Sequence, residues 1–311
     1  MRTGLDVTEI GFGGSVLGNL NRAMTDEQAH ATVERAWLGG VRYFDTAPHY
    51  GLGLSERRLG AALAHHRREE YVLSTKVGRL LVRNDAPTGS DLSAGGFDVP
   101  DDLCRRFDFS RDGVLRSLES SLERLGLDHL DIVYVHDPDD HVASAIAEAL
   151  PALIELRDEG VVGAVGVGMN QWQAPLRMVR ETDLDVVMLA GRWTLLDRSG
   201  QQLVAECAER GVAVVAAAPF NSGLLALDRP ADGAHFDYGP ASDELLGRAR
   251  ELADTCERHG THLPAAALQF ALRSPAVVSV VVGQRSPAQV ESTLELAEET
   301  ITDDAWTALR A

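Results

Sequence analysis

Short apolar runs alternate with longer amphipathic segments along most of the chain. The runs are rich in Val, Ile and aromatic residues, whereas the segments between them repeat apolar residues at helical spacing. Continuous apolar runs such as VVSVVV are typical of parallel strands that helices cover. The predicted strands are Glu9–Gly13, Val41–Asp45, Tyr71–Lys76, Leu130–His136, Val161–Gly166, Val186–Leu189, Val212–Ala217 and Val277–Val282.

The amphipathic segments between these runs predict helices, and capping residues mark several of their ends. The clearest segments are Asp26–Trp37, Ser55–His65, Arg111–Leu125, Val142–Glu159, Arg198–Arg210, Ser242–His259 and Ser286–Glu298. Residues suited to cap helix N-termini are Thr25, Ser55, Ser110 and Ser286. Glycines suited to end helices are Gly39, Gly40, Gly160 and Gly211.

The number of strand–helix units favours one kind of α/β fold. Eight units in 311 residues match a (β/α)₈ TIM barrel. The competing doubly wound fold would place a GxGxxG motif after a strand, but Val16 and Gln171 stand where the third glycine would be. We therefore predict a TIM barrel that forms a single domain over residues 1–311. Any dinucleotide would bind without a Rossmann fingerprint.

The segment 78–109 interrupts this alternation with mixed polar, Gly, Pro and charged residues. Loops of this length are usually covers of functional sites or disordered. On a barrel the segment would follow the third strand at its C-terminal end. We expect it to lie over the mouth of the barrel, where active sites of this fold are built.

Charge and cysteine content exclude several classes of protein. With 29 Lys and Arg against 47 Asp and Glu, the net charge is −18, which argues against binding nucleic acid or anionic membrane by bulk charge. Three scattered cysteines without a CxxC motif argue against a disulfide framework or a structural zinc site. The N-terminal stretch lacks the pattern of a secretory signal, and no apolar run reaches 18 residues. We expect a cytoplasmic protein.

Four residues at the predicted strand ends have side chains suited to proton transfer. Asp45 ends the second strand and Tyr50 follows it, Lys76 ends the third strand, and His136 ends the fourth. Because these strands are neighbours in a barrel, the side chains can converge. An ammonium near a phenol lowers the phenol's pKa, so Lys76 can activate Tyr50 while Asp45 holds Lys76. His136 can hydrogen-bond the substrate oxygen, and hydride transfer would need a cofactor.

Each of these residues also has an ordinary structural interpretation. An Asp after a strand often caps a loop, a Tyr in a turn often packs, and a lone His often lies in a core. Lys76 is harder to explain in this way, because an unpaired buried ammonium is costly. The run His136, Asp137, Asp139, Asp140 and His141 is rich in metal-ligand types. It has no HxH or HExxH spacing, so we expect no metal.

Three separated blocks resemble the aldo-keto reductase superfamily. They are FDTAPHYGLGLSERRLG, STKVGR and DIVYVHD, and the similarity extends over residues 10–293. The resemblance implies a (β/α)₈ barrel that binds NAD(P)H without a Rossmann fold. It also implies a catalytic set consisting of Asp45, Tyr50, Lys76 and His136.

Further phrases, including GVGMNQW and AAPFNSGLL, are similar to the sugar 1-dehydrogenase group of that superfamily. The group contains L-fucose dehydrogenase and D-threo-aldose 1-dehydrogenase, with pyridoxal 4-dehydrogenase as a near relative. The resemblance implies oxidation of the anomeric carbon of an aldose to a lactone, with Tyr50 as acid and base. The alternatives are a pyridoxal 4-dehydrogenase, a general aldehyde or ketone reductase and, more distantly, a non-catalytic cofactor-binding barrel. The expected partner is a small sugar or aldehyde, and the oligomeric state stays open.

The resemblance also implies positions for the cofactor and substrate. The expected cofactor-binding residues are Gly14, Asp45, Gly168, Asn170, Pro219, Phe220, Asn221, Ser222, Gly223, Leu224, Gly283, Gln284, Arg285 and Gln289. Family members often carry a glutamine and a stacking tyrosine where this chain has Ala190 and Ala217. Trp193 is expected either to replace the stacking tyrosine or to contact the substrate, and His49 is the other expected substrate contact. His235 and Tyr238 are expected in a loop over the mouth.

The choice between NAD and NADP depends on the segment after the eighth strand. Gly283 and Gln289 stand where NADP-specific members of the family carry basic residues. Loss of two cations weakens binding of the 2′-phosphate, so NAD is the expected cofactor. Arg285 keeps NADP as the alternative.

Overall fold

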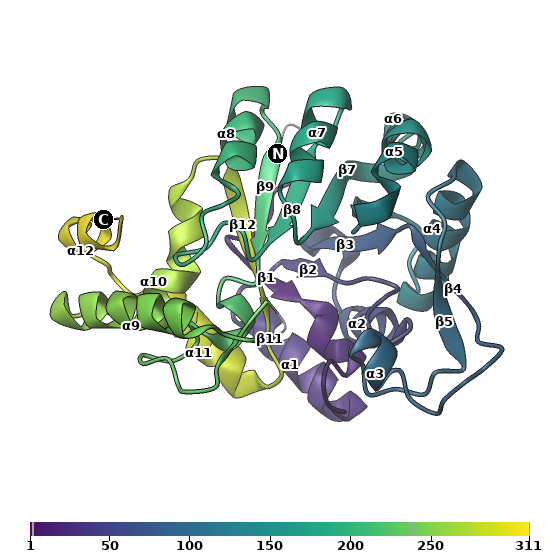
Figure 1. Ribbon diagram of the computed structural model, residues 1–311. Helices are drawn as coiled ribbons and strands as arrows, with labels where there is room; N and C mark the ends of the chain where they lie inside the picture. The colour runs from purple at the N-terminus through teal and green to yellow at the C-terminus, as the bar shows by residue number, and fades with distance from the viewer. Residues whose placement is uncertain (2, 238, 311) are drawn as a thin grey trace.

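The computed structural model describes residues 1, 3–237 and 239–310, and its centre is a closed barrel of eight parallel strands (Figure 1). The order around the barrel is β1-β12-β9-β8-β7-β6-β3-β2, which confirms the predicted TIM barrel. The barrel strands are β1 (Ile10–Gly13), β2 (Tyr43–Asp45), β3 (Val72–Val77), β6 (Leu130–His136), β7 (Val162–Met169), β8 (Val186–Ala190), β9 (Ala213–Ala217) and β12 (Val277–Gly283).

Helices surround the barrel and cover its outer face (Figure 1). They are α1 (Asp26–Leu38), α2 (Leu54–Leu63), α4 (Arg111–Leu125), α5 (Val142–Ser144), α6 (Leu150–Asp158), α7 (Gln173–Glu181), α8 (Gln201–Arg210), α10 (Leu263–Phe270) and α11 (Pro287–Glu298). A π-helical turn, Ala145–Ala149, joins α5 to α6. The helices α9 (Asp243–Arg258) and α12 (Asp303–Arg310) extend from one side of the barrel and share an apolar cluster with α10. Among the described residues, no helix combines the length and apolar character needed to span a membrane.

Most of the predicted helix caps are present. Thr25, Ser110 and Ser286 each accept a hydrogen bond from the backbone N–H three residues on. The prediction for Ser55 is wrong, because α2 begins at Leu54 after Gly53. The Ser55 hydroxyl instead donates to the carbonyl of Gly14 at 2.6 Å, which ties α2 to the end of β1.

The segment 78–109 has secondary structure of its own. An antiparallel hairpin pairs β4 (Arg79–Arg83) with β5 (Leu103–Phe107), and a short helix, α3 (Leu92–Gly95), lies between them. The carboxylate of Asp101 accepts the backbone N–H groups of Thr88 and Gly89 at 2.6 and 2.7 Å. The segment is therefore an ordered substructure held by its own hydrogen bonds rather than a loop without secondary structure.

Side chains that point into the barrel form an apolar floor with a polar layer above it. Because side chains alternate along a strand, Tyr43 and Asp45 share the inner face of β2, and Ser74 and Lys76 share that of β3. Apolar side chains fill the floor and include Val72, Ile132, Ala164, Val186 and Val215. The polar residues lie above them at the carboxyl ends of the strands, and they form the base of the site described next.

Candidate active site

A buried ion pair joins the ends of β2 and β3. The Nζ atom of Lys76 lies 2.6 Å from Oδ2 of Asp45, and the two side chains are only 2% and 4% exposed. Lys76 also donates to the carbonyl of Thr46 at 2.9 Å, and the hydroxyl of Ser74 donates to Oδ1 of Asp45 at 2.7 Å. Burial raises the pKa of Asp45, whereas Lys76 and Ser74 oppose that rise. The pair therefore holds an ammonium at a fixed point in a dry site.

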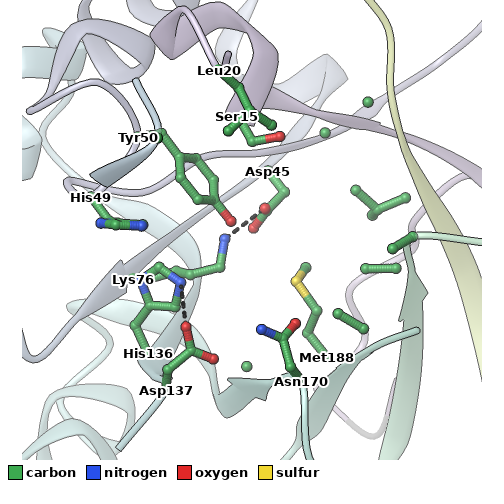
Figure 2. Close-up of a pocket in the computed structure, with 18 of the residues that line it drawn as sticks. Ser15, Leu20, Asp45, His49, Tyr50, Lys76, His136, Asp137, Asn170 and Met188 are labelled. Carbon is green, nitrogen blue, oxygen red and sulfur yellow. Dashed lines mark hydrogen bonds and ion pairs between the residues drawn. The ribbon is translucent and has the colours of Figure 1, made fainter. Parts of the chain in front are cut away.

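Tyr50 lies over this ammonium (Figure 2). The Nζ atom of Lys76 is 4.8 Å from the centre of the Tyr50 ring. Close packing of the backbone fixes the loop that carries Tyr50, since a Cβ atom on Gly18 would lie 2.5 Å from the carbonyl carbon of Tyr50. Gly51 adopts a φ of +62° where it contacts Gly18. Two glycines thus position the phenol beside Lys76.

His136 completes the group from the end of β6. Its ring meets that of Tyr50 edge to face, with 5.8 Å between centroids. Burial lowers the pKa of His136 well below the ordinary value, and the positive charges of Arg79 and Lys76 act in the same direction. The imidazole is therefore neutral at physiological pH. A neutral imidazole donates from one ring nitrogen and accepts at the other.

These side chains line one cavity of about 470 Å³ at the mouth of the barrel. The lining includes Asp45, His49, Tyr50, Lys76 and His136. Gly95, Gly96 and Phe97 from the segment 78–109 form part of its wall, as expected for a segment over the mouth. In the described part of the chain, no group of three or more His, Cys, Asp or Glu side chains is arranged to hold a metal ion.

The opposite wall of the cavity is built from small residues. Gly168 and Gly283 line it together with Ala190 and Ala217, and Asn170 adds an amide. A Cβ atom on Gly168 would have its nearest neighbours at 3.7 Å, so this side of the cavity is open. A flat nicotinamide ring with its carboxamide fits such a wall. Gly14, in contrast, lies outside the cavity lining. A Cβ atom added at Gly14 would lie 2.6 Å from the carbonyl oxygen of Asp45, so the backbone packs closely there.

The segment after β9 lines this cavity only through its first residue, Ala218. None of the six residues of the predicted pyrophosphate loop lines it: Pro219, Phe220, Asn221, Ser222, Gly223 and Leu224. Asn221 and Ser222 have positive φ values of 46° and 58°, and such strained backbone is frequent at ligand sites. Leu224 is fully buried among apolar side chains, so its side chain belongs to the core and only its backbone is left for a cofactor contact.

Beyond β12, the predicted adenosine-binding residues form a bonded cluster. The guanidinium of Arg285 donates to the carbonyls of Leu20 and Arg22, and its backbone N–H donates to Oε1 of Gln289 at 2.7 Å. The side chain of Gln284 is buried, and its Nε2 atom has no hydrogen-bond partner among the described residues. Arg285 thus ties the loop after β12 to the loop after β1.

The two expected substrate contacts have different positions. His49 lines the cavity and meets Phe97 edge to face at 5.2 Å, and burial lowers the pKa of His49 to about 2. Trp193 does not line the cavity and packs against Phe270 with 5.4 Å between centroids. The prediction of a substrate contact at Trp193 therefore has no support in the geometry. His235 lies in the short strand β10 (His235–Phe236), outside the cavity lining, and Tyr238 lies outside the described residues.

Four further residues of this region were not predicted from the sequence. Phe97 and Met188 line the cavity, Ser74 lies beneath Asp45, and Arg79 pairs with Asp137 at 2.6 Å. The position of Ser74 could have been predicted from the alternation of side chains along a strand, since Ser74 lies two residues before Lys76 and shares its face of β3. The position of Phe97 could not have been predicted in this way, because it depends on the conformation of the segment 78–109.

Comparison with known proteins agrees with this geometry. A model of the aldo/keto reductase family matches residues 9–311. The chain belongs to the aldo-keto reductase family. It is 48% identical to a D-threo-aldose 1-dehydrogenase of a Pseudomonas species, over 98% of this chain and 94% of that protein. It is 39% identical to a pyridoxal 4-dehydrogenase of Microbacterium luteolum, over 100% of this chain and 95% of that protein.

A solved structure of the family has the same fold. The holo form of an aldo-keto reductase from Bacillus halodurans superposes with a TM-score of 0.76 at 25% identity, covering 98% of this chain and 92% of that one. Membership of the family makes this protein an NAD(P)-dependent oxidoreductase. The resemblance of its three sequence blocks to that family is thereby confirmed.

Proposed function

We propose that this enzyme oxidises the anomeric carbon of an aldose, in its cyclic hemiacetal form, to a lactone. The observation that carries the proposal is the arrangement at one cavity of the buried Asp45–Lys76 pair, the Tyr50 phenol and the neutral His136. The similarity to a D-threo-aldose 1-dehydrogenase supports an aldose as the substrate class.

The side chains divide the proton chemistry between them. The anomeric hydroxyl lies between Tyr50 and His136, and a ring N–H of His136 donates to its oxygen. The ammonium of Lys76 stabilises the phenolate form of Tyr50, which takes the hydroxyl proton as the C–H bond breaks. The bound nicotinamide supplies the hydride acceptor. Asp45 holds Lys76 in place beside Tyr50.

The wall of Gly168, Asn170 and Ala190 is the part of the site that would hold the nicotinamide. At the adenosine end we propose a preference for NAD over NADP. Gly283 and Gln289 provide no positive charge, and the guanidinium of Arg285 is already bonded to the carbonyls of Leu20 and Arg22. A 2′-phosphate would have to draw Arg285 away from these carbonyls. NADP remains the weaker alternative cofactor.

A second candidate function is pyridoxal 4-dehydrogenase activity. The 39% identity to such an enzyme over the whole chain favours it. Pyridoxal also closes to an internal hemiacetal, so the same residues would oxidise it to a lactone. The two candidates therefore differ in substrate and share one mechanism.

The test measures the reduction of NAD, and in separate assays that of NADP, by the purified enzyme. The substrates are pyridoxal and a panel of aldoses that includes L-fucose, D-arabinose and L-galactose. Efficient oxidation of an aldose is expected, with NAD favoured. Turnover of pyridoxal alone would establish the second candidate. Reduction of simple aldehydes without oxidation of any hemiacetal would leave a general carbonyl reductase.

The role of Tyr50 has its own test in the variant Tyr50→Phe. Loss of the acid–base group is expected to lower kcat by about 10²- to 10⁴-fold. Tyr71→Phe is the matched control, because Tyr71 precedes β3 at the opposite end of the barrel and lies outside the cavity lining. Equal activity of the two variants would refute the proposed mechanism.

A further inference from the structure

Asp137 follows the catalytic histidine directly and has an unusual backbone conformation. Its φ is +38°, in the left-handed region that residues other than glycine rarely adopt. Its N–H still donates to the carbonyl of Gly168 at 3.0 Å, so the turn comes immediately after the last bond of the β6–β7 ladder. Strained backbone of this kind persists where the surroundings fix it, and it is concentrated at functional sites. Here the turn leaves Asp137 in the cavity lining (Figure 2).

A guanidinium from the neighbouring hairpin braces the Asp137 carboxylate. Nη2 of Arg79 lies 2.6 Å from Oδ2 of Asp137, and the two side chains are 13% and 19% exposed. Arg79 is itself held over the ring of Phe107 at 5.3 Å. Burial raises the pKa of Asp137, whereas Arg79 and Lys76 lower it. Of the other groups around it, the charge of Asp139 opposes ionisation, and the hydrogen bond from the Asn170 backbone N–H favours it.

The same carboxylate oxygen lies next to the point of reaction. Oδ2 of Asp137 is 3.5 Å from Nε2 of His136, which is longer than a good hydrogen bond. A carboxylate offers about four lone-pair positions, more than Arg79 and the Asn170 N–H use. An oxygen on the carbon beside the reacting one would come close to this carboxylate whenever His136 holds the reacting oxygen. The structure therefore places a charged acceptor where a second substrate hydroxyl would lie.

We propose that Asp137, braced by Arg79, accepts a hydrogen bond from the substrate hydroxyl on the carbon next to the reacting carbon. The inference rests on the proposed function and deepens it, because it makes a vicinal hydroxyl a requirement of the substrate class. By this contact the site would favour sugars over simple aldehydes, which have no such hydroxyl. An alternative role, in which Asp137 merely orients His136, would affect all substrates equally.

The test is a cycle that pairs a change in the protein with a change in the substrate. Wild-type enzyme and Asp137→Asn are each assayed with L-fucose and 2-deoxy-L-fucose, or with the equivalent pair of whichever aldose of the panel is oxidised best. Asn keeps the size of the side chain and tolerates a positive φ. The control is Asp140→Asn, because Asp140 belongs to the same acidic run but is exposed and outside the cavity lining. The readout is the ratio of kcat/KM for the two sugars.

Wild-type enzyme and Asp140→Asn are expected to prefer the full sugar by about 10- to 100-fold, the range for a hydrogen bond to a charged group. Asp137→Asn is expected to reduce this preference by about tenfold or more. Equal losses on both sugars would overturn the inference and leave Asp137 as a positioning residue for His136. Equal use of both sugars by the wild-type enzyme would overturn it as well, while the proposed function stood. Failure to oxidise any aldose would overturn the proposed function, and the inference with it.

Discussion

The hydroxyl of Ser74 supports the buried ion pair from below, so its removal should destabilise the protein in a pH-dependent way. Ser74 donates to Oδ1 of Asp45 at 2.7 Å and lies 3.1 Å from the hydroxyl of Tyr43, which in turn lies 3.0 Å from that of Tyr134. All four residues are buried. Burial raises the pKa of both tyrosines, so they stay neutral. The series of hydrogen-bonded hydroxyl groups therefore supports Asp45 without adding charge.

The cost of Ser74→Ala follows from the two bonds that it removes. A hydrogen bond to a charged group contributes about 1.5–3 kcal/mol and a neutral one about 1 kcal/mol, so we expect a loss of about 2.5–4 kcal/mol. A chain of 311 residues has an unfolding entropy of roughly 0.65 kcal/mol/K, so the Tm should fall by about 4–6 °C. The change of volume is one oxygen atom and adds little.

The pH dependence distinguishes this loss from ordinary damage to the core. The folded-state pKa of Asp45 is raised, so its protonated form contributes stability at low pH, and this stability is lost as pH rises through the folded pKa. Ser74→Ala raises that pKa further, since it removes a bond to the ionised form. The destabilisation should therefore be larger at pH 8 than at pH 4, near the ordinary pKa of Asp, by about 1.4 kcal/mol for each added pKa unit.

Urea unfolding at the two pH values measures the effect, with Ser279→Ala as the matched control. Ser279 is equally buried in the barrel, but its hydroxyl donates to a neutral group, the carbonyl of Thr8, at 2.8 Å. Its removal should cost about 1 kcal/mol at both pH values. Equal and pH-independent losses in the two variants would refute the argument that Ser74 acts through the charge of Asp45.

Three further predictions address the catalytic loop, the histidine and the cofactor. Gly18→Ala would bring a Cβ atom within 2.5 Å of the Tyr50 backbone, so kcat should fall by about tenfold or more; unchanged kinetics would show that the loop adapts freely. Because the pKa of His136 is held well below 6.5, kcat/KM should not fall as the pH is lowered through 6.5. A fall of kcat/KM near that pH which is absent in His136→Asn would contradict this prediction. Introducing Gly283→Lys with Gln289→Arg should shift the NADP to NAD ratio of kcat/KM toward NADP by about tenfold, whereas an unchanged ratio would place the 2′-phosphate elsewhere.

The sequence was sufficient to predict the barrel and the convergence of its ionisable residues. Both follow from the alternation of apolar runs and helical segments, together with the rule that active sites lie at the carboxyl ends of barrel strands. One predicted strand end was wrong, since β7 continues to Met169 rather than stopping at Gly166. That extension matters, because it places Gly168 within the barrel wall of the cavity.

The positions of the other site residues depend on tertiary contacts, which local sequence patterns do not predict. Asp137 stands in a run of acidic residues that looks solvated, and its place in the cavity lining depends on the left-handed turn after β6. Phe97 reaches the site because its backbone pairs with Leu20, far away in sequence. Ser55 fits the pattern of a cap, but a tertiary bond to Gly14 takes its hydroxyl.

The protein separates the parts that fix the chemistry from those that select the substrate. The Asp45–Lys76 pair is anchored on two barrel strands, so changes outside the barrel leave it in place. The wall formed by the segment 78–109 is held differently: Arg105 pairs with both carboxylate oxygens of Asp91 at 2.6 Å and donates to the carbonyl of His49 at 2.9 Å. A substitution of Arg105 or Asp91 would therefore be transmitted to His49 and the cavity wall. On the proposed function, substitutions in this segment would alter substrate binding while the Asp45–Lys76 pair beneath it keeps its position.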